Sequence, residues 1–187
     1  MLIIGSHVSF GKNQLLGATE EAISYGSNTF MFYTGAPTNT VRKDIDNKYT
    51  QEAIELMQAN NIDIKNVVCH APYIVNLGNA SDPDKYNFSK DFIKKELTRC
   101  DEMGITKMVL HPGNAIGITP EEGLNKIDTI IIGILWNTIF KSGVIYIENV
   151  SFNNIDMADI KAKIAIFLTV NFINSTLIIN YINIIGF

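Results

Sequence analysis

Short apolar runs alternate along the chain with longer segments in which apolar residues recur every three or four positions. The short runs are rich in β-branched residues and lie between polar or glycine positions, a pattern typical of strands. The longer segments have the spacing of helices with one apolar face. The pattern predicts strands at 2–8, 28–34, 65–71, 107–111 and 144–150, and more weakly at 176–182.

Helix ends are marked by residues that favour caps. Asn13 can cap the first helix, while Gly26 and Gly104 can end the first and the third. The clearest start is Thr119-Pro120-Glu121-Glu122, a capping box with proline at the first helical position. The predicted helices cover 13–26, 48–59, 89–103, a segment beginning at 119 and, less clearly, 156–168.

The predicted strands end 27 to 41 residues apart, which suits repeated β/α units and a parallel sheet covered by helices. Strands that are apolar on both faces fit such a sheet. The sequence therefore predicts an α/β fold, a TIM-type (β/α) barrel. A full barrel takes about 250 residues, so the 187 residues predict a single partial domain over 1–187, with about five to six of the eight units. Such an open barrel would expose strand edges and invite pairing with another chain.

Residues 164–187 contain no charged residue, and this length could span a bilayer. Four asparagines within the segment disfavour a membrane span, because each would place an amide in hydrocarbon. A buried helix and strand of the barrel is the preferred interpretation, and an altered end of a longer protein is a further one. Residues 151–187 are treated as a divergent apolar C-terminal segment.

Composition narrows the function classes. The net charge of −4 argues against a generally basic surface for nucleic acid, although local cations or bound metal could still recruit phosphates. The two cysteines form no disulfide framework and favour a reducing compartment. The start of the chain does not read as a signal peptide. A cytoplasmic location is therefore predicted, no membrane association is expected, and no protein partner is evident.

The three histidines of the chain each stand at the end of an apolar run. They are His7, His70 and His111, and Glu148 ends a fourth run, VIYIENV, in the same way. Strand ends of a parallel barrel meet at one face, so these groups are expected to converge there. Zinc binds imidazole nitrogen and carboxylate oxygen, and three protein ligands suffice for a catalytic site. Each histidine taken singly could instead be a hydrogen-bonded structural residue.

Other candidates lie at the same rim. The loop from Thr34 to Lys43 carries Asn39 and Arg42 and could hold phosphates, or its cations could simply be solvated. Tyr73 follows His70 by three positions and could stack on a ligand or pack at the rim. The sequence contains no dinucleotide-binding glycine motif, P-loop, nucleophile elbow or H-E-x-x-H motif.

Five motifs in order carry a family resemblance. They are GSHVS (5–9), TGAPTNTVRK (34–43), HAPYIVNLGN (70–79), LHPGN (110–114) and IEN (147–149). Together they closely resemble the zinc-dependent apurinic/apyrimidinic endonuclease family known as endonuclease IV. The resemblance covers roughly the first 150 residues.

This resemblance implies a TIM-type barrel with three zinc ions, acting on double-stranded DNA that contains abasic sites. Zinc-activated hydroxide would hydrolyse the phosphodiester 5′ to the abasic site during base-excision repair. His70 and His111 match two ligands of one zinc, and Glu148 matches a catalytic carboxylate that bridges this zinc to a second. His7, the Asn39–Arg42 loop and Tyr73 match DNA-binding positions at the mouth of the site.

The resemblance weakens after Glu148. The family continues with a glycine-rich loop and a later Asp-Thr-Cys-His signature, whereas this chain reads VSFNN at 150–154 and IINY at 178–181. Ligands for only one zinc are evident. Two alternatives therefore stay open beside the active endonuclease: an impaired or inactive remnant that binds at most one zinc, and a metal-dependent sugar isomerase or epimerase on the same type of barrel.

Overall fold

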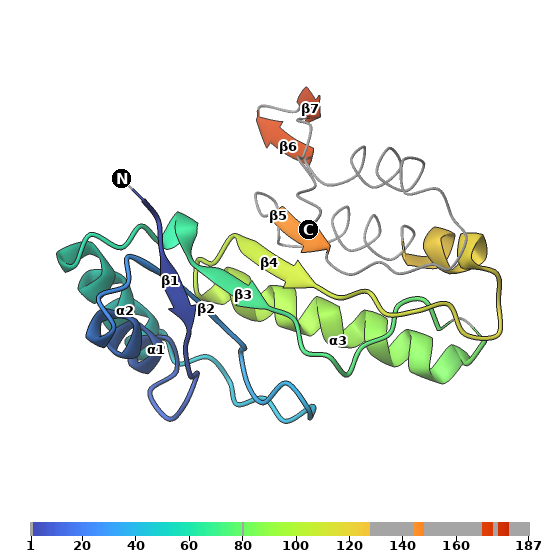
Figure 1. The fold of residues 1–187 in the computed structure, drawn as a ribbon, viewed down its shortest axis with the longest axis horizontal. Helices are drawn as coiled ribbons and strands as arrows, with labels where there is room; N and C mark the ends of the chain where they lie inside the picture. The colour runs from blue at the N-terminus through green and yellow to red at the C-terminus, as the bar shows by residue number, and fades with distance from the viewer. Residues whose placement is uncertain (1, 80, 128–143, 148–169, 174–175, 180–187) are drawn as a thin grey trace.

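The computed structural model describes residues 2–79, 81–127, 144–147, 170–173 and 176–179, with side chains described in the first two ranges (Figure 1). From β1 to β4 its strands and helices alternate in chain order, as predicted. The elements are β1 (Gly5–His7), α1 (Gln14–Ser24), β2 (Thr29–Phe32), α2 (Asn47–Ala59), the 3₁₀ turn η1 (Ile64–Asn66), β3 (Val68–His70), α3 (Pro83–Glu102), β4 (Lys107–Leu110), β5 (Val144–Ile147), β6 (Val170–Ile173) and β7 (Thr176–Ile179). Residues 120–127 are also helical.

The first five strands form one parallel sheet in the order β1-β2-β3-β4-β5. A helix connects β1 to β2, β2 to β3 and β3 to β4, which is the repeated β/α unit of a TIM-type barrel. The predicted fold class is confirmed: the chain forms part of such a barrel. Every described strand of this sheet therefore ends at the same edge, where the candidate residues stand.

The sixth predicted strand differs from expectation. Thr176–Ile179 is a strand, but it pairs antiparallel with Val170–Ile173 in a separate two-stranded sheet. It is therefore not a further member of the parallel sheet. The helix predicted at 156–168 lies outside the described residues. No helix in the described part of the chain is long and apolar enough to cross a membrane.

Local signals explain most helix ends. The predicted capping box forms: the Thr119 amide donates to Glu122 Oε2 (2.8 Å) and the Glu122 amide donates to Thr119 Oγ1 (3.2 Å). Gly26 and Gly104 both have a φ of +71°, which glycine adopts without a Cβ penalty. Asn13 occupies the cap position of α1 but makes no side-chain cap hydrogen bond.

Helix α3 begins six residues earlier than predicted, at Pro83 rather than at 89. The reason is local. Asp82 accepts a hydrogen bond from the Lys85 amide (3.1 Å), and Pro83 has the φ that suits a first helical position. The first turn of α3 is mostly polar, so the spacing of apolar residues did not indicate this start.

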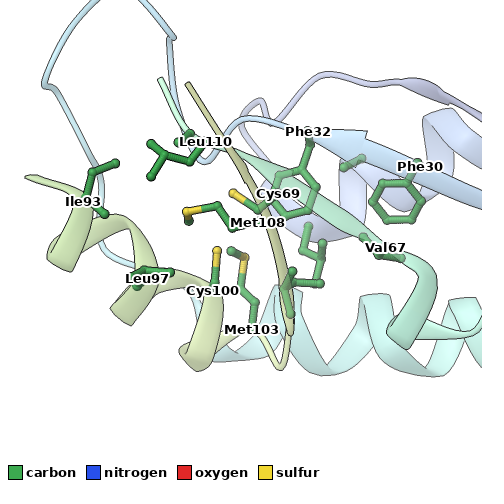
Figure 2. Close-up of a cluster of buried hydrophobic side chains, with 14 of the residues drawn as sticks. Phe30, Phe32, Val67, Cys69, Ile93, Leu97, Cys100, Met103, Met108 and Leu110 are labelled. Carbon is green, nitrogen blue, oxygen red and sulfur yellow. The ribbon is translucent and has the colours of Figure 1, made fainter. Parts of the chain in front are cut away.

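The hydrophobic core lies between the sheet and its helices. On α3, Ile93, Leu97 and Cys100 face a row of strand residues that includes Cys69, Met108 and Leu110 (Figure 2). All of these side chains are buried. The buried strand residues therefore alternate with residues that face the other side of the sheet, and the candidate site uses that second side.

We predict that Leu97→Ala lowers the free energy of unfolding by about 2–5 kcal/mol, because Leu97 is 1% exposed and truncation leaves a cavity. Lys94→Ala, an exposed position on the same helix, should change it by less than about 0.5 kcal/mol. Urea denaturation followed by circular dichroism measures both. Equal effects of the two variants would contradict this packing.

Candidate functional site

Strand register brings the sequence candidates onto one face of the sheet. Phe32 lies opposite Cys69, and both are buried in the core. Side chains alternate along a strand, so the residues that follow, Tyr33 and His70, turn toward the opposite face. His7 is level with Met31, two positions before Tyr33, and so shares that face. Val109 is the partner of His70, and His111 lies two positions beyond Val109, so His111 also shares this face.

The rings of these residues form a continuous cluster. The ring centroids of His7 and Tyr33 are 4.7 Å apart, those of Tyr33 and His70 4.8 Å, and those of His70 and His111 5.0 Å. Tyr73 closes the cluster from the loop after β3, at 5.2 Å from His70 and 5.1 Å from His111. The structure thus brings together His7, His70, His111 and Tyr73, and adds Tyr33.

Hydrogen bonding fixes the orientation of His70. Its Nδ1 lies 2.6 Å from the Ala71 carbonyl oxygen, which can only accept, so Nδ1 carries the proton and donates. The other ring nitrogen, Nε2, then faces His111. This is the arrangement of a metal-binding histidine whose second nitrogen is held by a backbone carbonyl.

The two imidazoles fit a shared metal ion. His70 Nε2 and His111 Nε2 are 3.2 Å apart. Two nitrogens, each about 2.0–2.1 Å from one tetrahedral zinc, would be about 3.3–3.4 Å apart. The observed separation, at which the two nitrogens can share a hydrogen bond, is close to the separation that a common zinc ion requires. In the described residues there is no group of three or more His, Cys, Asp and Glu that could hold a metal, and Glu148 lies outside those residues.

Burial differs across the cluster. His70 is 4% exposed and His111 is half-buried, whereas His7 and Tyr73 are exposed. Burial raises the pKa of Tyr33, and its hydrogen bond with Tyr73 raises that pKa further. Tyr33 therefore stays a neutral phenol at physiological pH. The site therefore combines a buried histidine of fixed orientation, His70, with the exposed rings of His7 and Tyr73.

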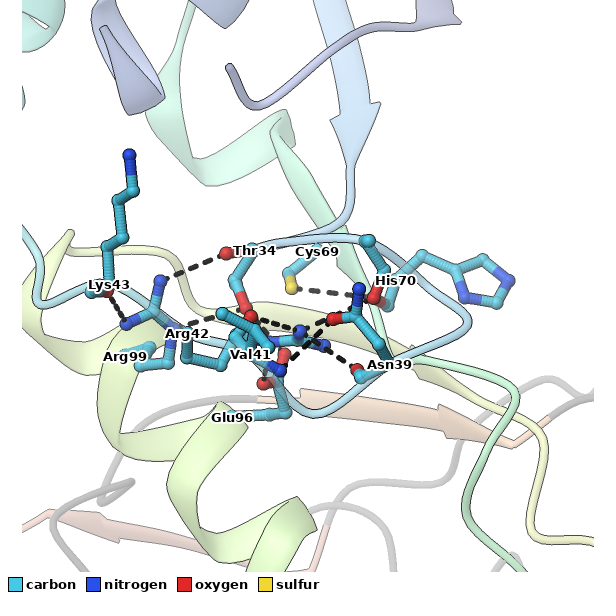
Figure 3. Close-up of polar contacts among 10 residues, drawn as sticks. Thr34, Asn39, Val41, Arg42, Lys43, Cys69, His70, Glu96 and Arg99 are labelled. Atoms are coloured by element: carbon cyan, nitrogen blue, oxygen red, sulfur yellow. Dashed lines mark hydrogen bonds and ion pairs between the residues drawn. The ribbon is translucent and has the colours of Figure 1, made fainter. Parts of the chain in front are cut away.

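A buried ion pair joins the loop at 34–43 to helix α3 (Figure 3). Arg42 Nε donates to Glu96 Oε1 at 2.7 Å, and both side chains are fully buried. Arg42 Nη1 also donates to the carbonyls of Ala36, Asn39 and Val41 (2.9–3.3 Å). Arg42 is thus not a solvated loop cation, one of the two roles considered for it, because its charge is used inside the loop.

Glu96 and Arg99 hold the 34–43 loop in place, and neither was predicted from the sequence. Thr34 Oγ1 donates to Glu96 Oε2 (2.5 Å), and Arg99 donates to Thr34 Oγ1 (3.2 Å), to the Thr34 carbonyl (2.9 Å) and to the Lys43 carbonyl (2.5 Å). Burial lowers the pKa of Arg99, and the charge of Glu96 opposes that change. A usable signal existed: Glu96 falls within the apolar stripe of α3, where a carboxylate needs a partner.

A pocket of about 360 Å³ lies beside this loop. Its lining includes Phe10, Thr34 and Asn39 together with three cations, Lys12, Lys43 and Arg99. Asn39 is exposed, and its side chain accepts from the Val41 amide (3.0 Å). The loop therefore lines a recess that contains three cationic side chains, and it begins directly after Tyr33 of the histidine cluster.

Comparison with known proteins places this geometry in a family. Residues 19–133 match the family described as xylose isomerase-like TIM barrel. The chain belongs to this family. A relative named probable endonuclease 4 from Enterococcus faecalis is 45% identical over 136 residues, covering 72% of this chain and 45% of the relative. One of the same name from Bacillus subtilis is 48% identical over 128 residues, covering 68% of this chain and 42% of the relative.

These relatives confirm the resemblance to the endonuclease IV family. The chain spans less than half the length of either relative. The crystal structure of endonuclease IV from Thermus thermophilus has a TM-score of 0.64 at 21% identity, covering 77% of this chain and 51% of that one, which shows the shared fold. The match to the barrel family includes His70, Tyr73 and His111, so the histidine pair belongs to the shared barrel.

We predict that Glu96→Ala destabilises the protein by about 3–5 kcal/mol, because it leaves the buried charge of Arg42 without its partner. Glu102→Ala, at the exposed end of the same helix, is the matched control and should have little effect. Urea unfolding gives the free energies, and limited proteolysis reports opening of the 34–43 loop. A loss below about 1 kcal/mol for Glu96→Ala would contradict a structural role for the pair.

Proposed function

We propose that this chain carries part of a zinc-dependent endonuclease site that hydrolyses the phosphodiester 5′ to abasic sites in double-stranded DNA. The observation that carries the proposal is the pair of imidazole nitrogens, His70 Nε2 and His111 Nε2, 3.2 Å apart at the ends of adjacent strands. Relatives named endonuclease 4, at 45–48% identity, support the same assignment. A cytoplasmic location suits the two buried, free cysteines.

His70 and His111 would hold the zinc ion, with Glu148 as the proposed third and catalytic ligand. A zinc ion bound there would polarise the phosphoryl group and lower the pKa of a water molecule. The protein orients the His70 ring. The Ala71 carbonyl fixes the tautomer of His70, and Tyr33 packs against its ring on the side of His7. The pair is thereby oriented before any ligand arrives.

The exposed rim would contact DNA. Tyr73 is 59% exposed and its ring stands directly beside both metal-binding imidazoles. It is proposed to stack in the space left by the missing base, where displacement of the nucleotide costs least. His7 and Asn39 are exposed and are proposed phosphate or sugar contacts. Arg42 is proposed to act on DNA indirectly, by holding the shape of the Asn39 loop.

The second candidate is a related protein that binds one zinc without cleaving DNA. It is favoured by one observation: after Glu148 the chain reads VSFNN at 150–154 and IINY at 178–181, in place of the glycine-rich loop and the Asp-Thr-Cys-His signature of the endonuclease IV family. The two candidates share the zinc-binding histidines, His70 and His111, and differ only in whether DNA is cleaved.

We predict that the purified protein binds zinc with His70 and His111 and, with zinc, incises a duplex oligonucleotide carrying one abasic site. His70→Ala and His111→Ala should each abolish tight zinc binding, because each removes a direct ligand, and reduce incision to background. Asp101→Ala, exposed on α3, should match the wild type. Atomic absorption measures zinc, and gel electrophoresis measures incision before and after chelation.

The two readouts distinguish the candidates. Zinc binding that depends on both histidines, without incision, would favour the non-cleaving protein. Zinc binding or incision that survives both substitutions would overturn the assignment of the pair.

We also predict that Tyr73→Ala weakens binding to abasic duplex DNA by about 5- to 150-fold, since stacking of one base on an aromatic ring contributes about 1–3 kcal/mol. Tyr25→Ala is the matched control, because Tyr25 is 62% exposed and Tyr73 59%. Fluorescence anisotropy with intact and abasic duplexes measures both. A similar small loss for both variants would contradict a stacking role.

A further inference from the structure

The loops that follow β3 and β4 are joined by a side chain that the proposed function does not use, Asn76. The two strands are neighbours, and the segments after them leave the sheet side by side (Figure 1). Asn76 Oδ1 accepts from the Asn114 amide (3.1 Å), which belongs to the other loop, and from the Gly78 amide (3.0 Å) in its own loop. Because a carbonyl oxygen has two lone pairs, this one atom holds the backbone of both loops.

Asn76 is itself anchored to helix α3. Its backbone amide donates to Ser89 Oγ (3.0 Å), and Ser89 is a buried residue of α3. The next residue, Leu77, is fully buried, and its amide donates to the Pro112 carbonyl (2.7 Å). The loop after β4 is therefore bonded to a segment that the core holds in place.

The two loops lie in close contact at Asn76. Gly113 has a φ of +87°, and a Cβ at this position would overlap the Asn76 carboxamide. Only a residue without a side chain fits here at low strain, so the backbone of the second loop lies directly against Asn76. A contact this close leaves little freedom between Asn76 and the turn that follows His111.

This turn bears on the position of His111. Strand β4 ends at Leu110, so His111 is the first residue of the loop and stands two positions before Gly113. His70, in contrast, lies within β3, and its Nδ1 is held by the Ala71 carbonyl. The 3.2 Å separation of the two Nε2 atoms therefore depends on where the loop after β4 is placed.

We propose that Asn76 is a positioning residue that sets His111 against His70. Its side-chain oxygen holds the Asn114 backbone, three positions after His111. Asn76 also stands three positions after Tyr73, whose ring centroid is 5.1 Å from that of His111. The consequence for zinc rests on the proposed function: ligands that are held close to the required geometry bind a metal more tightly than ligands that must first be ordered.

The test compares Asn76→Ala with Asn76→Asp. Alanine removes the acceptor, whereas aspartate keeps an oxygen that can accept both amide bonds. Asp46→Ala is the matched control, because Asp46 also accepts from a backbone amide, that of Lys48 (2.9 Å), but caps α2 in the β/α unit before β3. Asn114→Pro is a second variant, which removes the donor at an exposed position and leaves Asn76 in place.

The first measurement is nuclear magnetic resonance of the metal-free protein, with the ring of His7 as internal reference. We expect Asn76→Ala to shift the ring resonances of His111 and to speed exchange of the Asn114 amide. Asp46→Ala should leave both as in the wild type, and Asn76→Asp should keep the slow exchange.

Three results would overturn the proposal. They are unchanged His111 resonances in Asn76→Ala, an equal shift in Asp46→Ala, and fast exchange of the Asn114 amide in Asn76→Asp. Should Asn76→Ala not fold, Asn114→Pro decides: it is expected to shift the His111 resonances, and unchanged resonances overturn the proposal.

Zinc affinity, measured by competition with a chromophoric chelator, tests the consequence for the metal pair. We expect Asn76→Ala to weaken zinc binding by about 10-fold or more, the loss that follows when the support of a metal ligand is removed. Asp46→Ala should leave zinc binding unchanged, and an equal loss in that control would overturn the positioning role.

The two measurements separate this proposal from the proposed function. A wild type that binds no zinc, together with shifted His111 resonances in Asn76→Ala, would refute the zinc endonuclease and support the positioning role. Zinc binding through His70 and His111 that Asn76→Ala does not weaken would leave the metal pair intact and overturn the positioning role.

Discussion

The parallel register of β2, β3 and β4 is the constraint on which the site depends. Because Phe32 is paired with Cys69 and His70 with Val109, one set of side chains enters the core and the alternate set meets on the other face. A shift of one residue in β3 would exchange Cys69 and His70, burying an imidazole among apolar side chains. The core packing of Cys69 against α3 therefore also aims His70, which is how hydrophobic burial positions polar chemistry here (Figure 2).

A second support holds the rim. The buried carboxylate of Glu96 is bonded to Arg42 and Thr34, and Arg99 is bonded to Thr34 and the Lys43 carbonyl, so helix α3 and the 34–43 loop are joined by charged hydrogen bonds (Figure 3). A buried ion pair of this kind specifies one geometry more than it adds stability, because desolvation offsets much of the attraction. The shape of the loop that carries Asn39 is thereby fixed, and the buried Arg99 that fixes it also lines the pocket, together with the exposed Lys12 and Lys43.

Several elements of this arrangement could be predicted from the sequence. The five parallel strands, the capping box at Thr119, the glycine stops and the convergence of the three histidines all follow from local patterns and from barrel topology. The early start of α3 could not be read from apolar spacing, because its first turn is polar. Nor could the antiparallel pairing of β6 with β7, since apolar runs do not encode the direction of pairing. The part played by Glu148 stays a prediction.

The sequence by itself determined the order of elements, the residue types available for metal binding and the family, because these depend on periodicity and on short motifs. Only the tertiary structure decided which atoms meet. It set the 3.2 Å separation of two nitrogens 41 residues apart in the chain, the enclosure of Arg42 by a helix more than 50 residues away, and the order of the five parallel strands. Such contacts depend on register and on the packing of distant segments, which no local stretch of sequence specifies.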